Sequence, residues 1–364
     1  MAKIRLLFIL PAACLFAAGA CMGQTISWYK KYNGTIDKYP ISMQLHKTGH
    51  KYAGYYYYNS RQEPVYFTGE DTTEAGHIKV NAYLPNNETD ENFNFSIKGN
   101  SAAGQWYATE KSKALPFSAK EDTSASAFDY IYTEGTTMLR PAMKESPAAS
   151  FDAATIWPKE NSAQSIFLKK LIADAFGEKN STEDIGKIFL RQKKKFLYDY
   201  LEQYKDTKEE ELKDAWSYNS DQSDQVMIVY RSSKLLVLAH LSSSYTGGAH
   251  GIYGTSYIPV DLVNNKKIEL SNVITVAGQK QLSKLLEKSF RKAYSVKDKD
   301  SLSEGGLFEN KISPNDNFYV TAKGIGFCYN PYEIGPFAMG EINLFIPFTE
   351  LNVYLQPGFK KLIQ

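Results

Sequence analysis

Two stretches indicate the structure of the second half of the chain. They are SSSYTGGAHGIYGTSYIPVD at residues 242–261 and GIGFCYNPYEIGPFAMG at residues 324–340. Each contains a loop rich in glycine and tyrosine, set between runs whose apolar residues follow β-strand patterns. Glycine adopts backbone conformations that are closed to other residues, so such loops can hold aromatic and polar side chains close together. We therefore expect the two loops to touch, and any ligand of this region to lie along their tyrosine-lined edge.

The two loops and their flanking strands also carry histidine and carboxylate side chains. The candidate ligand-binding residues are Tyr245, His250, Tyr253, Asp261, Tyr329, Tyr332 and Glu333. Aromatic rings with a polar group suit both sugar stacking and protein interfaces. The structural alternative is that the glycines form a tight turn, that His250 braces it through a hydrogen bond, and that Glu333 caps the second loop.

Over residues 155–356 the order of these motifs resembles the C-terminal domain of the RsiV-like family. The resemblance rests on YTGGAHG followed by a Tyr-containing strand, an Asp and a polar turn, and then on G-I-x-F-x-Y-x-P-Y-E-I-G-P-F-A-x-G before a strand that ends in Ile-Pro. This domain of unknown function also occurs in a lysozyme-sensing anti-sigma factor and in a peptidoglycan deacetylase, where a separate domain performs the catalysis. The resemblance implies an envelope-facing binding domain, with neither signalling nor deacetylation carried over.

The first part of the chain has the pattern of an antiparallel all-β domain. Across residues 24–118, short runs rich in β-branched and aromatic residues alternate with turns that contain Gly, Asn or Asp. In the tyrosine run at residues 55–58, two rings must face one side of the strand and two the other. The GYYYY strand and the later strand with Gly104, Gln105 and Trp106 resemble a small β domain common in secreted proteins of Bacteroidetes. That resemblance implies an architecture and no activity.

A shift to small polar residues indicates a linker at residues 119–154, with one strand within residues 130–139. The domain that follows, residues 155–364, begins with two amphipathic helices, and a third helix precedes the closing strands. Helices grouped apart from antiparallel strands indicate an α+β fold. The chain is therefore predicted as an N-terminal antiparallel all-β domain followed by an α+β domain whose helices pack on an antiparallel sheet.

The amino terminus predicts export. Lys3 and Arg5 precede an apolar run of signal-peptide length at residues 6–18, so residues 1–23 are expected to be a signal peptide. The sequence Ala-Gly-Ala-Cys that ends at Cys21 resembles a bacterial lipobox, in which the Cys is lipidated. The alternative is ordinary cleavage nearby, which releases a free periplasmic protein. The predicted location is thus periplasmic, or the outer membrane with a lipid anchor as the only membrane attachment.

Composition and motif content limit the classes of partner and cofactor that the sequence supports. A formal net charge of +2 gives no reason to expect a nucleic-acid partner. Two of the three cysteines lie in the leader, which leaves Cys328 as a buried small side chain and predicts no disulfide framework. The sequence lacks the fingerprints of dinucleotide, phosphate-loop, zinc-protease, serine-hydrolase and paired-cysteine sites. We therefore predict no cofactor and no metal.

Three functions are compatible with these observations. The leading one is an exported, non-enzymatic protein of the bacterial cell envelope that binds an envelope glycan or a secreted protein such as a lysozyme. The second is a cell-wall hydrolase or deacetylase-like enzyme with His250 as base and Glu333 or Asp261 as partner, which requires these side chains to meet in a cleft. The third is a purely structural envelope protein, with no concave site between the loops.

Overall fold

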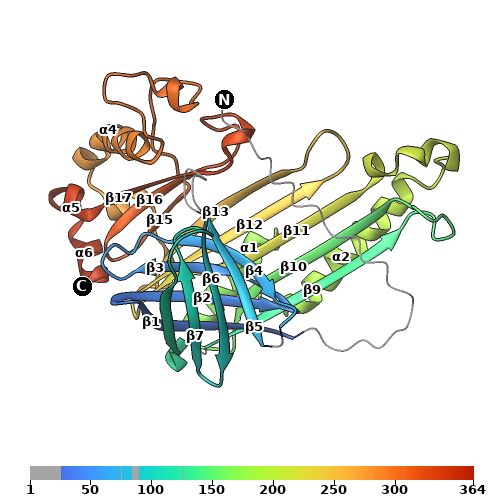
Figure 1. Ribbon diagram of the computed structural model, residues 1–364, viewed down its shortest axis with the longest axis horizontal. Coiled ribbons are helices and arrows are strands. Elements are labelled where there is room, and N and C mark those ends of the chain that lie inside the picture. The colour runs from blue at the N-terminus through green and yellow to red at the C-terminus, as the bar shows by residue number, and fades with distance from the viewer. Residues whose placement is uncertain (1–25, 75, 84–89, 126) are drawn as a thin grey trace.

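The computed structural model describes residues 26–74, 76–83, 90–125 and 127–364 of the 364-residue chain. The predicted leader and Cys21 lie outside the described residues. Figure 1 shows an N-terminal barrel, coloured blue to teal, in front of a long sheet that runs from green to yellow. An orange and red C-terminal region lies at one end of this sheet. None of the helices in the described ranges is long and apolar enough to span a membrane.

Eight antiparallel strands form the closed barrel, and consecutive strands are paired. They are β1 (Ser27–Ile36), β2 (Tyr39–Thr48), β3 (Lys51–Tyr58), β4 (Val65–Asp71), β5 (His77–Tyr83), β6 (Asp90–Lys98), β7 (Ser101–Tyr107) and β8 (Leu115–Glu121). The barrel closes because β1 also pairs with β8, which sets Tyr32 opposite Glu121 and Ile36 opposite Phe117. A closed barrel has no free strand edge, so the predicted β domain exposes no template for pairing with other chains.

The tyrosine run of β3 connects the barrel to the rest of the molecule. Tyr56 is fully buried in the barrel core, whereas Tyr55 and Tyr57 point outward and are buried against the second half of the chain. The prediction that the rings alternate between two faces is confirmed, and both faces are buried. Tyr57 packs on Tyr230 of the large sheet, with ring centroids 5.5 Å apart.

The large sheet has six strands in the spatial order β14-β13-β12-β11-β10-β9. Its strands are β9 (Phe128–Met138), β10 (Ala148–Pro158), β11 (Ser220–Arg231), β12 (Leu235–Tyr245), β13 (Ile252–Asp261) and β14 (Lys266–Lys267). β10 and β11 run parallel, and the other pairs are antiparallel. A parallel pair needs a long crossover connection, and here that connection contains α1 (Ala163–Ala175) and α2 (Ile185–Gln203).

Helices α1 and α2 cover one face of this sheet, as the shared core cluster of helices and strands shows. Ser162 caps the start of α1 by accepting a hydrogen bond from the amide of Ser165, and Asp184 caps α2 by accepting one from Lys187. The other face of the sheet contributes to the core cluster that contains the outward-facing tyrosines of the barrel. The large sheet is therefore the layer between the helices and the barrel.

The C-terminal region is built on a three-stranded sheet of order β15-β16-β17. Its strands and helices are β15 (Phe318–Val320), β16 (Gly324–Tyr329), β17 (Ile342–Pro347), α3 (Leu270–Val273), α4 (Val276–Ala293), α5 (Phe348–Leu351) and α6 (Pro357–Ile363). Short 3-10 helices are η1 (Thr123–Ala125), η2 (Glu209–Tyr218), η3 (Leu302–Gly305), η4 (Phe337–Met339) and η5 (Asn352–Tyr354). One side of α4, with Leu282, Leu286 and Phe290, is fully buried in the core shared with this sheet.

The predicted α+β fold class is confirmed, with an all-β barrel followed by helices and sheets. Two features differ from the prediction. The large sheet is mixed rather than purely antiparallel, because β10 and β11 are parallel. Residues 148–154, predicted as linker, belong to β10 in the interior of the sheet. Ala149 and Ala153 there are fully buried, so the small side chains reflect close packing with α2 rather than a linker composition.

Candidate binding site

The two glycine-rich loops meet, as predicted. The first, residues 246–251, connects β12 to β13, and the second, residues 330–341, connects β16 to β17. Gly247 and Gly248 have φ values of 93° and 101°, which other residues rarely adopt. A β-carbon at Gly247 would also lie 2.7 Å from the carbonyl oxygen of Ser217. The first loop therefore needs glycine both for its backbone conformation and for space.

Four rings, from the two loops and the start of β13, form what we call the aromatic cluster: His250, Tyr253, Tyr332 and Phe337. His250 stacks on Phe337, with ring centroids 4.1 Å apart and ring planes 24° apart. The centroid of Tyr332 lies 5.6 Å from that of Phe337 and 6.3 Å from that of His250. Tyr253 meets Phe337 edge-on at 5.5 Å. The cluster lies at the surface, because Tyr253 is 42% exposed and Tyr332 is 55% exposed.

Tyr332 has a strained backbone conformation. Its φ of 70° lies in the left-handed region, which is a genuine outlier for a bulky residue. The conformation costs on the order of 1–2 kcal/mol. The amide of Tyr332 donates to the carbonyl of Gly335 at 3.1 Å, and this bond helps to hold the turn. Core packing does not explain strain at an exposed ring, and strain of this kind is concentrated at functional sites.

Two hydrogen bonds orient the ring of His250. Its Nδ1 lies 2.8 Å from the carbonyl oxygen of Gly251, and since a carbonyl only accepts, Nδ1 carries the proton. In the neutral ring Nε2 is then an acceptor, and the hydroxyl of Tyr332 donates to it at 3.3 Å. His250 therefore braces the first loop and links it to the second.

Two asparagines attach the C-terminal region to the free edge of β13. Asn330 accepts from the amide of Thr255 at 2.8 Å and donates to its carbonyl at 3.3 Å. Asn317 accepts from the amide of Tyr257 at 2.8 Å and donates to the Thr255 carbonyl at 2.7 Å. A β-carbon at Gly254 would lie 2.8 Å from Oδ1 of Asn330, so glycine permits this approach. The side-chain amides thus take the place of a neighbouring strand.

A half-buried carboxylate, Glu341, lies next to the aromatic cluster. Burial raises the pKa of Glu341, and the hydrogen bond that its Oε1 accepts from Thr255 at 2.7 Å opposes this effect. Burial and the Glu341 carboxylate together raise the pKa of Tyr253. Cys328 is buried as predicted, and burial with the Glu341 charge raises the pKa of its thiol well above the usual value. A thiol with a raised pKa is a poor nucleophile, so this group supplies no catalytic thiolate.

Two of the predicted tyrosines brace the fold. Tyr329 is buried, and its hydroxyl donates to the carbonyl of Ser313 at 2.7 Å. Burial raises the pKa of Tyr329. The hydroxyl of Tyr245 donates to the carbonyl of Gly248 at 3.0 Å, which closes the turn of its own loop. Of the predicted tyrosines, Tyr253 and Tyr332 are therefore the ones that the structure brings together with His250.

The predicted carboxylates lie apart from the aromatic cluster or cap a turn. Asp261 is buried, and its carboxylate accepts from two amides of the turn that follows. The 10 residues of β13 separate Asp261 from His250, a length of about 30 Å. Glu333 accepts from the amide of Asn330 at 3.0 Å and from the side chain of Asn315 at 2.7 Å. The structure therefore does not bring His250 and Asp261 together, and Glu333 caps the second loop.

Phe337 is the ring that contacts the other three. It was not among the ligand-binding residues predicted from the sequence. An isolated phenylalanine is usually a core residue, but Phe337 lies between Pro336 and the exposed Ala338 in a loop and is half-buried. Its place within the run GPFAMG could have indicated an exposed ring, because loops rich in Gly and Pro lie at the surface and seldom contribute core side chains. Asn317 and Asn330 carried no signal, because their role depends on a strand at least 60 residues away in sequence.

The aromatic cluster is suited to recognition. Its rings offer apolar area together with phenol hydroxyls, a combination that is common in binding surfaces. Within the part of the chain that the structure describes, no group of three or more His, Cys, Asp or Glu side chains is placed to hold a metal ion. The residues that line the cluster therefore support contact with a partner through aromatic surface.

Part of the C-terminal region is similar to a known protein family. Residues 271–349 match a family described as a protein of unknown function, DUF3298. The second loop lies inside this matched segment, and the first loop precedes it. No curated protein gives a significant match to this chain.

Two solved structures are similar to this chain. One is a DUF3298 family member from Bacteroides fragilis, with a TM-score of 0.58 and 25% sequence identity, covering 65% of this chain and 96% of that chain. The other is a DUF3298 family protein from Pseudomonas aeruginosa, with a TM-score of 0.44 and 18% identity, covering 64% of this chain and 95% of that chain. The first shows that this chain shares its fold with a DUF3298 protein over the matched share, and residues 271–349 are similar to the DUF3298 family.

Proposed function

We propose that this protein is exported to the bacterial cell envelope and binds a secreted protein there, with the aromatic cluster as the contact surface. The observation that carries the proposal is Tyr332, where the chain maintains a left-handed conformation at a bulky residue and exposes its ring. Such strain persists only where the surrounding structure enforces it, and it gathers at ligand-binding positions. Tyrosine is also enriched among the residues that dominate the free energy of protein interfaces.

An exposed apolar side chain near the cluster favours a protein over a sugar as the partner. Phe308 is 57% exposed where its amide donates to the carbonyl of Ile334 in the second loop. Such a side chain forms no hydrogen bonds with sugar hydroxyls, but its burial in a protein interface is favourable. The faces of His250 and Phe337 that stack on each other are also closed to a sugar ring.

The resemblance of the loop motifs to RsiV-like proteins supports a lysozyme as the partner, because that domain occurs in a lysozyme-sensing anti-sigma factor. The signal-peptide pattern at residues 1–23 supports export, with Cys21 as the site of a lipid anchor. The positions of Asp261 and Glu333 give no support to hydrolysis, because each carboxylate satisfies backbone amides of its own turn. The proposed activity is therefore binding.

The test is the affinity of the purified mature protein for a lysozyme, measured by biolayer interferometry. We expect Tyr332→Ala to raise the Kd at least tenfold, which corresponds to about 1.4 kcal/mol. Tyr198→Ala is the matched control, because Tyr198 is a similarly exposed tyrosine on α2, at 62% against 55% for Tyr332. This control should bind as the wild type does.

Soluble peptidoglycan glycan strands form the second arm of the same assay. Glycan binding that Tyr332→Ala abolishes, without lysozyme binding, would replace the protein partner by an envelope sugar. Wild-type affinity of Tyr332→Ala for lysozyme, or no binding of either probe, would contradict a binding role for the aromatic cluster.

Export is tested separately. Mass spectrometry of the mature protein should place its first residue at Cys21, and growth with a palmitate analogue should label the protein there. A mature amino terminus beyond Cys21 would contradict the lipid anchor. Uncleaved protein that stays in the cytoplasm would contradict export itself.

A further inference from the structure

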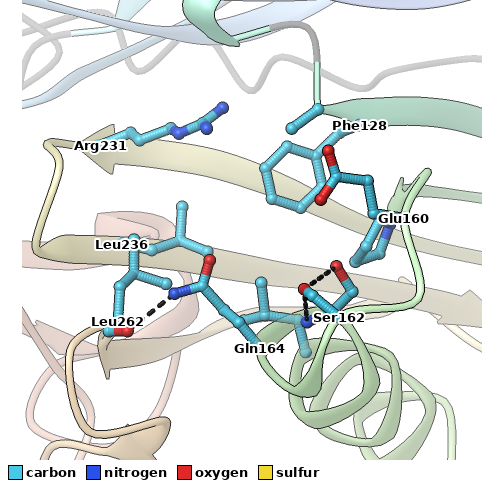
Figure 2. Close-up of a pocket in the computed structure, with 11 residues that line it drawn as sticks. Phe128, Glu160, Ser162, Gln164, Arg231, Leu236 and Leu262 are labelled. Atoms are coloured by element: carbon cyan, nitrogen blue, oxygen red, sulfur yellow. Dashed lines mark hydrogen bonds between the residues drawn. The ribbon is translucent and has the colours of Figure 1, made fainter.

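A small cavity lies where the large sheet meets the start of α1, at the opposite end of β12 from the aromatic cluster (Figure 2). Its volume is about 60 Å³. The lining comes from the starts of β9, α1 and β12, from the ends of β10 and β11, and from the connections that follow β10 and β13. Segments that are far apart in sequence therefore converge on this space.

Two opposite charges flank the cavity. In Figure 2, Arg231 and Glu160 lie on its two sides, with Phe128 between them. The guanidinium carbon of Arg231 lies 5.1 Å from the ring centroid of Phe128, a cation–π contact that orients the cation. Burial raises the pKa of Tyr29, and the neighbouring Arg231 charge opposes that effect. Arg231 thus packs on Phe128 beside Tyr29, and Glu160 is exposed at the mouth.

The rest of the lining adds oriented polar groups on an apolar base. The Nε2 of Gln164 donates to the carbonyl of Leu262 at 2.7 Å, which turns its Oε1 toward the cavity (Figure 2). Ser162, which caps α1, lies on the same side as Glu160 (Figure 2). Leu236 and Leu262 contribute apolar surface. The cavity therefore has a cation on one side, at Arg231, and the oxygen atoms of Glu160 and Gln164 elsewhere on its lining.

Size and charge together select the class of ligand. A water molecule needs about 10–15 Å³ of such volume, so the cavity has room for roughly four to six water-sized groups. Glycine and alanine are molecules of this size. We propose that the cavity binds a small α-amino acid, whose carboxylate meets Arg231. The ammonium group meets Glu160 and the Oε1 of Gln164.

Other ligand classes fit less well. A sugar or a nucleotide exceeds the volume of the cavity, and an inorganic anion leaves the Glu160 carboxylate without a counterion. The site is also independent of the aromatic cluster, because the 11 residues of β12 lie between them, a span of about 33 Å. Substitution of Tyr332 should therefore leave amino-acid binding unchanged, and this separates the two proposals.

The test is isothermal titration calorimetry of the mature full-length protein with glycine, L-alanine and D-alanine. Acetate and methylamine serve as probes that carry only one of the two charges. We expect saturable binding of at least one amino acid and at least tenfold weaker binding of both single-charge probes. Arg231→Gln and Glu160→Gln should each raise the Kd at least tenfold, whereas Arg61→Gln, at an exposed arginine of the barrel, should leave it unchanged.

Glu160→Gln keeps the test decisive if Arg231→Gln does not fold, because Glu160 is exposed and its replacement removes charge with little change of shape. Equal affinity for acetate and alanine would overturn the assignment of a zwitterion. Absence of saturable binding for all five probes would mean that the cavity holds water only, and would overturn the proposal.

Discussion

The hydroxyl of Tyr332 lies 3.3 Å from Nε2 of His250, and this contact joins two loops at positions 82 residues apart in sequence. His250 also stacks on Phe337 of the second loop, so the first loop contributes a ring whose orientation depends on the second. The second loop in turn presents Tyr332 from a left-handed backbone conformation. The aromatic cluster is therefore a product of both loops together.

Replacement of Tyr332 by glycine or alanine separates the effect of the ring from the effect of the backbone. Tyr332→Gly removes the ring and relieves the penalty of positive φ, whereas Tyr332→Ala removes the ring and keeps the penalty. We expect the glycine variant to have the larger free energy of unfolding, by about 1 kcal/mol, in urea denaturation. Both variants should lose partner binding to the same extent. Equal stability of the two would show that the strain at this position is negligible.

Asn317→Ala should destabilise the junction between β13 and the C-terminal region. The substitution leaves the amide of Tyr257 without its side-chain acceptor in a buried setting. We expect a loss of about 1–3 kcal/mol in the free energy of unfolding, measured by urea denaturation. Asn352→Ala, at an exposed position of η5, is the control and should change stability by less than about 0.5 kcal/mol. A similarly small loss for Asn317→Ala would rule out the bracing role.

His46 should make the protein sensitive to mild acid. Burial lowers the pKa of His46 to about 3, and its Nε2 accepts from the amide of Ile228 at 3.3 Å, which requires an unprotonated nitrogen. His46 of the unfolded chain binds a proton near pH 6.5, whereas His46 of the folded chain does not. Neutral His46 therefore contributes its full stabilisation of the fold above that pH. As pH falls from about 6.5 toward 3, stability should decrease by about 1.4 kcal/mol per unit at most.

The measurement for His46 is the slope of unfolding free energy against pH in wild type and in His46→Gln. The glutamine variant should be less stable at pH 7.5, because it loses a ring that stacks on Tyr29 at 4.9 Å, and its slope between pH 6.5 and 4 should be shallower. His77→Gln, at a histidine whose side chain is 41% exposed in the barrel, should keep the wild-type slope. Equal slopes in wild type and His46→Gln would contradict the lowered pKa.

Glu91 should make the stability of the fold decrease as the pH rises, the opposite of the effect of His46. Burial raises the pKa of Glu91 to about 7, while the indole of Trp106, which donates to its Oε2 at 3.3 Å, lowers it in part. The folded chain therefore keeps a proton that the unfolded chain loses near pH 4.5, and the stabilising contribution is complete below that value. It is lost as pH rises through about 7, at up to about 1.4 kcal/mol per unit.

Glu91→Gln keeps a polar group for Trp106 and for the phenol of Tyr56, which also donates to Glu91. We expect this variant to be more stable than wild type at pH 8 by about 1–3 kcal/mol in urea denaturation, and to lose the pH dependence between about 4.5 and 7. Glu145→Gln, at an exposed glutamate, should follow the wild type. If Glu91→Gln were less stable than the wild type at pH 8, the ionised Glu91 carboxylate would not destabilise the fold, and the raised pKa would be contradicted.

Local pattern was sufficient for much of the fold. The alternation of β3 predicted two faces for its tyrosine run, and Tyr55 and Tyr56 lie in different cores as a result. Apolar periodicity predicted two amphipathic helices at the start of the second domain, and the structure contains them as α1 and α2. Local sequence does not show which strand a given strand pairs with. Neither the closure of β1 on β8 nor the parallel pairing of β10 with β11 was therefore predicted.

Local sequence was enough to predict that two Gly and Tyr loops exist and that they flank β-strands. This follows because glycine content, strand alternation and motif order are properties of the local chain. Tertiary structure alone decided which side chains form the surface. It placed Phe337 against His250, buried Tyr329, and moved Asp261 to the other end of β13, because side-chain environment depends on contacts between segments distant in sequence.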